Sequence, residues 1–534
     1  MSLFKKSREQ LIAFALFFLV AILFQSLAGA YRSEFGSHPD EAAHYVTGLM
    51  MHDYLMHAWK ASPLHFANDY YSHYPKVGLG IWPPFFYMVQ SAWTFLFGTS
   101  RESILALIAA LSGGLGLSVF NAGKREVAPL TAFCAAAWLL ALPLVQQYSA
   151  MIMAEMLSAL TMFGATIYFG RFLETQKMGD AIAFGLFAAF AILTKGTGVA
   201  LALMAPAAIL LTRRYFILQK KELWMAVALI GVLAGPWTWY FRNQGRGGWE
   251  EPSPSWHFTR MAVNYYTFKF AVGLGILFSA FAIIGFIFVI KERKITNGVW
   301  AALLSLMVSV LIFQSILPVG LEARHLIPAI PAAMLFVAVG VESLTRFARR
   351  EISCAVISAL FFAGIFFPPK SAIGYGSIGN HLGFSAFRIP QKNFSGFSPI
   401  AEKLAADDRI RNILIASDAR GEGMFISEMA RRDPARASRT VQRASKLLAS
   451  STWSGSGYNS FFQNEDAVLK ALSDARLDAV VLDNSTPNSK PHQQLLRATL
   501  EHHPERFELR ETGAITRDGA TQADAICVYF AKQI

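Results

Sequence analysis

The chain has few cysteines and few charges for its length, and both shortages limit what it can be. Only three of its 534 residues are cysteines, and 16% are charged. Cys134 and Cys354 lie in apolar runs and Cys527 lies near the end, so neither a disulfide framework nor a Cys-x-x-Cys metal site is available. A hydrophobic content of 54% exceeds that of ordinary soluble domains. The composition therefore indicates a protein that crosses a membrane several times.

Eleven apolar runs are long enough, or nearly long enough, to cross a bilayer. They occupy residues 11–30, 103–121, 127–147, 155–173, 180–195, 197–212, 223–241, 268–290, 298–318, 325–345 and 353–368. The first run follows three basic residues and ends in AGA, so cleavage as a signal peptide is the alternative to a first span. Because many further runs follow, we expect this run to be retained as a span.

A further apolar stretch, residues 81–98, decides the predicted topology. It is short and aromatic, and Pro83 and Pro84 lie near its start. If it does not cross and the N-terminus is cytoplasmic, all basic clusters between spans lie inside, as the positive-inside rule requires. These clusters are Lys124/Arg125, Arg171/Lys177, Arg213/Arg214/Lys220/Lys221, Lys291/Arg293/Lys294 and Arg346/Arg349/Arg350. We therefore predict an interfacial or re-entrant helix at 81–98, with an ordinary short span as the alternative.

The net charge of +12 then reflects membrane topology, and no nucleic acid partner is expected. The same topology gathers ionisable residues at the outer face. They comprise a long first outer loop, residues 31–102, together with Glu155, Lys195, Arg324 and His325 near the ends of spans. Such residues are costly near a bilayer unless they have partners or face water, so their gathering predicts a shared site.

The chain changes character after residue 368. Residues 369–396 form a linker rich in glycine and serine, and residues 397–534 contain no further span. In this last part, RNILIASD and DAICVYFAKQ are typical of strands, GEGMFISEMARR of a helix, and NEDAVLKALSDARLDAVVLDN of a helix followed by a strand. We predict a transmembrane domain over 1–368 and an α/β domain over 397–534, which an odd number of spans places outside the cytoplasm.

Five motifs in order resemble the GT-C glycosyltransferases. They are HPDEAAHY, YPKVGLGIWPP, MAEM, LTKG and ARHLIPAIP. The resemblance covers residues 1–345 and is greatest to glycosyltransferase family 39, which contains protein O-mannosyltransferases and aminoarabinose transferases. It implies a polytopic α-helical membrane enzyme that moves a sugar from a polyprenyl-phosphate donor to an acceptor at the outer membrane face.

The resemblance makes Asp40 the general base. A carboxylate can take the proton of an acceptor hydroxyl as its oxygen bonds to the anomeric carbon, which gives inversion. Glu41 could orient the acceptor, act on Asp40 through like charge, or cap a helix. The competing interpretation of HPDEAAHY is a helix cap alone, with Pro39 and two acids in the first turn.

The resemblance also places cations beside the leaving phosphate, where negative charge develops. Lys195 and Arg324 match the family's positions, and together with His325, which follows Arg324, they are the predicted donor phosphate-binding residues. The alternative for Lys195 and Arg324 is snorkelling at helix ends. Glu155 is predicted either to hold the acceptor or to form an ion pair with one of these cations.

One departure from the family leaves donor and acceptor open. The aminoarabinose branch has a lysine directly before its Pro-Pro, whereas Trp82 stands there and the nearest lysine is Lys76. We assign Lys76 and Tyr74 to acceptor or donor binding without a more specific role. Tyr74 and Trp82 could stack on a sugar or belong to the aromatic belt of the interface.

Six of the twelve histidines fall in the first outer loop, and His44 follows Asp40 at the i,i+4 spacing of helix-borne ligands. A divalent metal such as zinc or manganese is therefore a candidate cofactor, although no HExxH pattern supports it. Two other functions stay open: a transporter or flippase of a lipid-linked substrate, and a non-catalytic scaffold for envelope assembly. Transporters tend to show repeats and midplane charges, which we do not find. We expect a bacterial inner membrane location, with protein, lipid and polysaccharide all possible acceptors.

Overall fold

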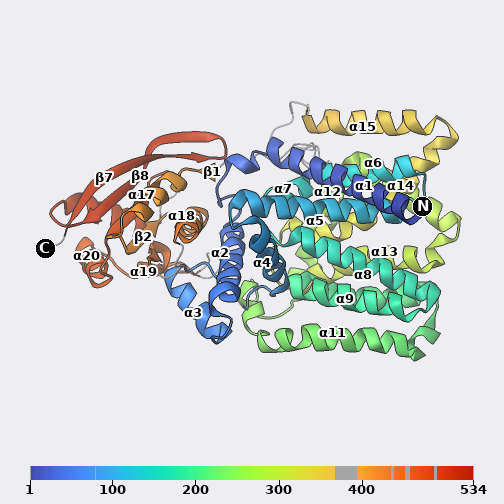
Figure 1. Cartoon of the computed structure of the whole chain (residues 1–534), viewed down its shortest axis with the longest axis horizontal. Coiled ribbons are helices and arrows are strands. Elements are labelled where there is room, and N and C mark those ends of the chain that lie inside the picture. Colours follow the sequence, from blue (N-terminus) through green and yellow to red (C-terminus); the bar gives the residue numbers. More distant parts are fainter. Residues whose placement is uncertain are drawn as a thin grey trace.

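The computed structural model describes residues 2–78, 80–366, 394–433, 438–451, 457–485 and 490–532. The predicted linker over 369–396 lies outside the described residues except for its last three. A bundle of long helices forms one part of the molecule, and a sheet with its own helices lies at one end of that bundle (Figure 1).

The bundle consists of helices that follow the predicted apolar runs. They are α1 (Ser2–Leu27), α5 (Arg101–Gly123), α6 (Pro129–Ala141), α7 (Pro143–Ser149), α8 (Glu155–Thr175), α9 (Met178–Thr194), α10 (Leu201–Thr212), α11 (Lys221–Tyr240), α12 (Trp256–Lys291), α13 (Gly298–Ile316), α14 (Ile330–Ser343) and α15 (Arg350–Phe366). In the described part of the chain, seven helices are long and apolar enough to cross a membrane, or eight if one bent pair is a single span. The protein is thus a polytopic membrane protein.

Two spans differ in shape from the predicted runs. The run over 127–147 is the bent pair α6 and α7, whose axes differ by 61°. Pro143 begins α7, and a proline disfavours helical geometry in the residue before it, so α6 ends there. Helix α12 begins twelve residues before its predicted run and breaks at Gly275, where φ is 73°. Only glycine adopts this backbone conformation without strain.

The connection between α1 and α5 carries three helices at the end of the bundle. They are α2 (Pro39–Asp53), α3 (Pro63–His73) and α4 (Phe85–Phe97). Figure 1 shows α2 and α4 running crosswise to the long helices. Helix α4 contains 13 residues, which span about 20 Å and fall short of a bilayer core of about 30 Å. This helix occupies the stretch predicted to be interfacial or re-entrant.

The C-terminal part contains a mixed sheet of six strands. The strands, in sheet order, are β1 (Phe394–Ser395), β7 (Phe507–Arg517), β8 (Ala520–Ala531), β6 (Ala479–Asp483), β2 (Asn412–Ala416) and β3 (Thr440–Arg443). Strand β2 runs parallel to β3 and β6, and the other neighbours are antiparallel. Every strand and helix predicted from the four quoted segments is present, which confirms a C-terminal α/β fold.

The sheet separates two layers of helices because its strands alternate in side-chain direction. Ile413 and Ile415 of β2 pack in the same apolar cluster as α17 (Phe397–Ala406) and α18 (Ala419–Arg432). Leu414 packs in a second cluster with α20 (Glu465–Asp474) and α21 (Pro491–His502). Helix α18 contacts α2, so the C-terminal domain rests directly on the connection between α1 and α5.

Candidate functional site

Four of the predicted site residues meet in one ionic cluster. The Arg324 Nη2 atom lies 2.9 Å from Asp40 Oδ2, and the Lys195 Nζ atom lies 2.6 Å from Glu155 Oε1. A third distance of 3.7 Å, between Arg324 Nη1 and Glu155 Oε1, joins the two pairs. None of these side chains is more than 15% exposed. Residues far apart in sequence therefore form one buried charged site.

The start of α2 positions Asp40. His38 is the N-cap residue, and its Nδ1 atom accepts a hydrogen bond of 3.1 Å from the Asp40 backbone N–H. Pro39 occupies the first helical turn, where its missing N–H costs nothing. The cap uses only the backbone of Asp40 and leaves its carboxylate facing Arg324. The predicted cap and the predicted base are therefore compatible in one motif.

Interruptions of the helices deliver the other three side chains. Glu155 is the first residue of α8. Lys195 has an extended backbone between the end of α9 and a short 3-10 turn. Arg324 lies in the 3-10 segment Ala323–Ala329 that precedes α14. All three residues therefore lie at the ends of helices, where the change in backbone direction allows their side chains to meet.

Glu322, which was not among the predicted site residues, is central to this cluster. Its Oε1 atom accepts a hydrogen bond of 2.9 Å from Arg324 Nη2, and its Oε2 atom lies 2.8 Å from Arg324 Nε. The same Oε2 lies 3.4 Å from His38 Nε2. Burial raises the pKa of Glu322, but the hydrogen bond from His38 and the charge of Arg324 outweigh it and hold the pKa below its ordinary value. Glu322 is therefore held as a carboxylate.

The cluster contains more acids than permanent cations. Asp40, Glu155 and Glu322 face Lys195 and Arg324, so three negative charges meet two positive ones and leave a formal charge of −1. One carboxylate oxygen, Oε2 of Glu155, is buried and has no hydrogen-bond partner in the described residues. A buried polar atom without a partner is costly, and only a few occur in a native protein.

Glu41 lies outside the cluster, although it is adjacent to Asp40. Its carboxylate forms an ion pair of 2.8 Å with Arg101 and accepts hydrogen bonds from the backbone N–H groups of Ser37 and Ile152. The side chain is fully buried. Glu41 thus joins the start of α2 to α5 and to the segment that leads into Glu155.

His325 and His44 are buried beside the cluster and hydrogen-bonded to tyrosines. The Nδ1 atom of His325 lies 2.8 Å from the Tyr266 hydroxyl. The Nδ1 atom of His44 lies 2.9 Å from the Tyr87 hydroxyl. Burial lowers the pKa of His44 to about 4, so this imidazole is neutral at neutral pH. In the described ranges, no group of three or more His, Cys, Asp or Glu side chains is arranged to hold a metal ion.

Tyr74 and Lys76 contact the C-terminal domain. The Tyr74 hydroxyl donates a hydrogen bond of 2.6 Å to Asp433, and Lys76 Nζ lies 3.4 Å from the Ala419 carbonyl oxygen. Lys76 is 7% exposed. Burial, followed by the charge of Arg443, lowers the pKa of Lys76 to about 8. These two residues join the connection between α1 and α5 to the domain that covers it.

The comparisons with known proteins agree with this architecture. Residues 82–240 match a family model described as dolichyl-phosphate-mannose-protein mannosyltransferase. This segment includes Glu155 and Lys195, whereas Asp40 and Arg324 lie outside it. No curated protein matches the chain in sequence.

Solved structures extend the likeness to almost the whole chain. ArnT from Cupriavidus metallidurans bound to undecaprenyl phosphate is 15% identical, with a TM-score of 0.59 over 96% of this chain and 97% of that one. The apo form of that protein gives 14% identity and a TM-score of 0.60 over the same shares of the two chains. An oligosaccharyltransferase from Archaeoglobus fulgidus, tethered to an acceptor peptide, is 13% identical, with a TM-score of 0.52 over 100% of this chain and 75% of that one.

Because sequence identity is low throughout, these structural likenesses establish the fold alone. The chain has the GT-C glycosyltransferase fold with a C-terminal domain, and this confirms the resemblance drawn from the motifs. The resemblance drawn from the motifs ends at residue 345, whereas the structural likeness includes the C-terminal domain.

Proposed function

We propose that the protein is a membrane glycosyltransferase that moves a sugar from a polyprenyl-phosphate carrier to an acceptor hydroxyl, with Asp40 as general base. The observation that carries this proposal is the buried cluster, in which a carboxylate lies 2.9 Å from Arg324 and one further cation, Lys195, belongs to the same network. A base next to phosphate-binding cations is the arrangement that glycosyl transfer from a lipid phosphate requires.

The reaction is a single displacement. Asp40 takes the proton of the acceptor hydroxyl while its oxygen bonds to the anomeric carbon and the bond from that carbon to the phosphate oxygen breaks. The polyprenyl phosphate leaves with the electron pair, and the new bond has inverted configuration. Arg324 and Lys195 stabilise the charge that develops on the phosphate, and Arg324 has five N–H donors to share between Asp40, Glu322 and an oxyanion.

The other predicted site residues receive supporting roles in this proposal. Glu155 holds Lys195 in place, and Glu41 positions Asp40 by fixing the start of α2 through Arg101. His325 fixes the segment that carries Arg324 through its bond to Tyr266. Lys76 and Tyr74 hold the C-terminal domain beside the site, from which the domain could contact an acceptor.

The position of the cluster supports a lipid-linked donor. It lies at one end of an apolar bundle, where the phosphate of a lipid carrier would meet the membrane boundary. The structure of ArnT with bound undecaprenyl phosphate shows that a protein with this fold accommodates such a carrier.

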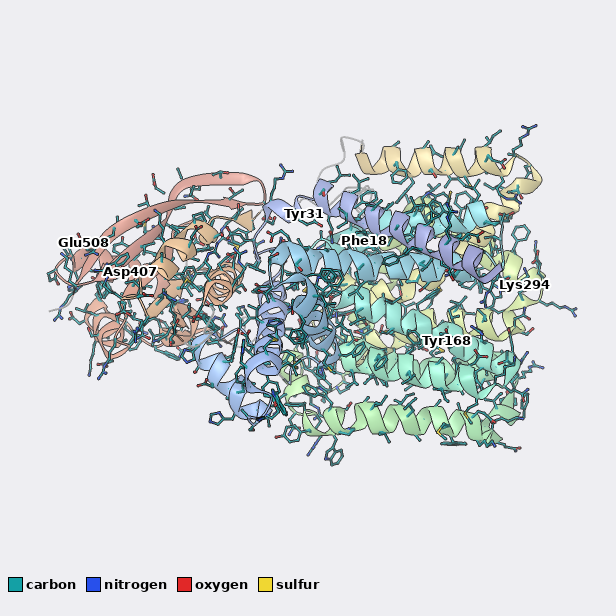
Figure 2. The ribbon with its side chains drawn as sticks, viewed as in Figure 1. Phe18, Tyr31, Tyr168, Lys294, Asp407 and Glu508 are labelled. Atoms are coloured by element: carbon teal, nitrogen blue, oxygen red, sulfur yellow. The ribbon has the colours of Figure 1, made fainter. Side chains whose placement is uncertain are left out.

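The arrangement of the two ends supports an outward-facing site. The N-terminus and Lys294 lie at the end of the bundle away from the C-terminal domain, which carries Asp407 and Glu508 (Figures 1 and 2). The positive-inside rule places an end with basic clusters in the cytoplasm. We therefore place the cluster and the domain over 397–534 on the extracytoplasmic side, in a bacterial inner membrane, with residues 1–368 as the transmembrane domain.

Mass spectrometry of lipid-linked sugars and envelope glycans in matched cells tests the function. The cells carry wild type, Asp40→Asn, no copy, or Glu342→Gln, a control that changes a carboxylate on the opposite end of the bundle. We expect one glycan to lose a sugar and a polyprenyl-phosphate sugar to accumulate in Asp40→Asn and null cells, but not in the control. Full glycan and an unchanged donor pool in Asp40→Asn cells that contain folded protein would contradict the proposal.

A further inference from the structure

The proposed reaction leaves a proton on Asp40 at every turnover, and this proton must reach solvent before the next acceptor binds. The side chain of Asp40 is only 7% exposed. Direct loss to bulk water is therefore hindered, and the base needs a neighbour that can pass the proton outward. This inference rests on the proposed function.

His38 and Glu322 form a graded path from Asp40 toward solvent. The His38 Nδ1 atom lies 3.6 Å from Asp40 Oδ2, and His38 Nε2 lies 3.4 Å from Glu322 Oε2. The exposed fraction of the side chain rises along this path from 7% for Asp40 to 19% for His38 and 35% for Glu322. Each step therefore moves the proton to a more hydrated group.

The other described groups in contact with Asp40 or near it do not offer such a path. Arg324 keeps its proton at any physiological pH. Lys195 and Glu155 are paired with each other and are less exposed than Glu322. His44 is 3% exposed, and its Nδ1 is bonded to the Tyr87 hydroxyl. Tyr148, whose ring centroid is 6.5 Å from that of His38, is 5% exposed.

The tautomer of His38 suits a relay. Because Nδ1 accepts the backbone N–H of Asp40, the ring proton lies on Nε2, which faces the Glu322 carboxylate. Imidazole can accept a proton on one nitrogen while it releases one from the other. Glu322 is a carboxylate whose Oε2 atom faces Nε2 of His38, so it can take this proton briefly and pass it to water.

We propose that His38 and Glu322 carry the proton from Asp40 to solvent. The O–H bond of protonated Asp40 breaks as an N–H bond forms at His38 Nδ1, which gives up its bond to the backbone N–H. The Nε2–H bond of His38 breaks as an O–H bond forms at Glu322 Oε2. Glu322 then releases this proton to water, and exchange of His38 with water restores the starting tautomer.

A purely structural role is the competing explanation, because His38 also caps α2. Three substitutions separate the two roles. His38→Asn retains a good capping side chain but cannot relay a proton. His38→Gly removes the ring and leaves room for added imidazole. Glu322→Gln leaves the cap of α2 intact and removes the final proton acceptor.

The experiment measures transfer by the full-length protein in membranes from null cells, supplied with lipid extract from Asp40→Asn cells as the donor source. We expect His38→Asn and Glu322→Gln to lower kcat about 10-fold or more with little change in KM. Added imidazole should restore His38→Gly, and the solvent deuterium isotope effect should rise in His38→Asn.

Two results would overturn the relay: wild-type kcat in His38→Asn, or a slow His38→Gly that imidazole does not accelerate. Asp40→Asn, measured in parallel, keeps this test separate from that of the proposed function. Loss of transfer in Asp40→Asn together with wild-type rates in His38→Asn would contradict only the proton relay. Full transfer in Asp40→Asn would contradict the proposed glycosyltransferase mechanism itself.

Discussion

Each end of the helical bundle carries an arginine paired with carboxylate side chains, and the two arginines differ in burial and in the number of carboxylates around them. At the end away from the C-terminal domain, Arg350 pairs with Glu342, and their side chains are 37% and 21% exposed. At the other end, Arg324 is 11% exposed and lies within 4 Å of three carboxylates. A matched, partly exposed pair fastens α14 to the start of α15. A shared, buried cation with an excess of acids costs stability, and in our proposal it serves chemistry.

Substitution of the two arginines should give the largest difference. Arg324→Gln leaves two buried carboxylates and the partly exposed Glu322 with Lys195 alone, so we expect transfer to fall below detection. We also expect the protein to lose about 3 to 5 kcal/mol of stability, as when one partner of a buried ion pair is removed. Arg350→Gln should retain transfer and melt close to wild type, because an ion pair near the surface contributes little. Glycan mass spectrometry measures transfer, and thermal unfolding in detergent measures stability. Equal effects of the two substitutions on transfer and on stability would contradict the difference drawn between the two arginines.

A double-mutant cycle sharpens the comparison within the cluster. Lys195 and Glu155 are in direct contact, so their effects on transfer should not be additive. We expect Lys195→Met and Glu155→Gln each to lower kcat/KM by about 10-fold to 100-fold, and the double variant to be no worse than Lys195→Met. A double variant whose loss equals the product of the two single losses would mean that Glu155 acts on the acceptor independently.

Glu41 should affect stability more than chemistry. Its ion pair with Arg101 is almost fully buried, so Glu41→Gln should lower the free energy of unfolding by about 3 kcal/mol. The folded fraction should still transfer sugar at a rate within a few-fold of wild type. Activity normalised to folded protein, measured by size-exclusion chromatography and transfer assay, checks this. A normally folded Glu41→Gln that lacks transfer would instead place Glu41 among the reacting groups.

The smallest predicted effect is a pH dependence where the domain meets the bundle. Glu34 accepts hydrogen bonds from the backbone N–H groups of Gly396, Phe397 and Ser398 at the start of α17. Burial, together with the charge of Glu428, raises the pKa of Glu34 from 4.5 to about 7. Because docking raises this pKa, the contribution of Glu34 to docking is fully present below pH 4.5 and is lost as the pH rises through about 7.

Hydrogen exchange of residues 394–398 should therefore be slower at about pH 5 than at about pH 8, after correction for the intrinsic rate. Glu34→Gln should flatten this difference while Asp433→Asn, which changes another contact between loop and domain, should not. Identical pH dependence in wild type and Glu34→Gln would show that Glu34 does not control docking.

The fold was predictable where local patterns determine structure. A span must be a long apolar run because it crosses a bilayer. Successive side chains of β2 and β6 point to opposite faces of the sheet because this is the geometry of a strand. The bend before Pro143 and the turn between β7 and β8 had readable signals as well. Asp518 and Gly519 have φ values of 50° and 89°, which is the reason for an Asp-Gly pair in a tight hairpin.

Partnerships between distant residues were not predictable from one sequence. Arg101 is 60 residues from Glu41, and the pairing of Tyr74 with Asp433 spans 359 residues. Glu322 escaped notice because the recognised motif starts at Ala323, although a carboxylate two residues from a candidate phosphate-binding arginine is a signal in itself. The roles of the site residues remain predictions, whereas their positions are now defined.

The most direct test of the central claim is transfer by the purified protein in lipid nanodiscs, with the lipid-linked sugar that accumulates in Asp40→Asn cells as donor. Membranes from null cells supply the acceptor, and NMR of the isolated product gives its anomeric configuration. The account predicts that wild type releases free polyprenyl phosphate and forms a glycoside of inverted configuration, while Asp40→Asn does neither. Consumption of the donor by Asp40→Asn at the wild-type rate, or a product of retained configuration, would contradict it.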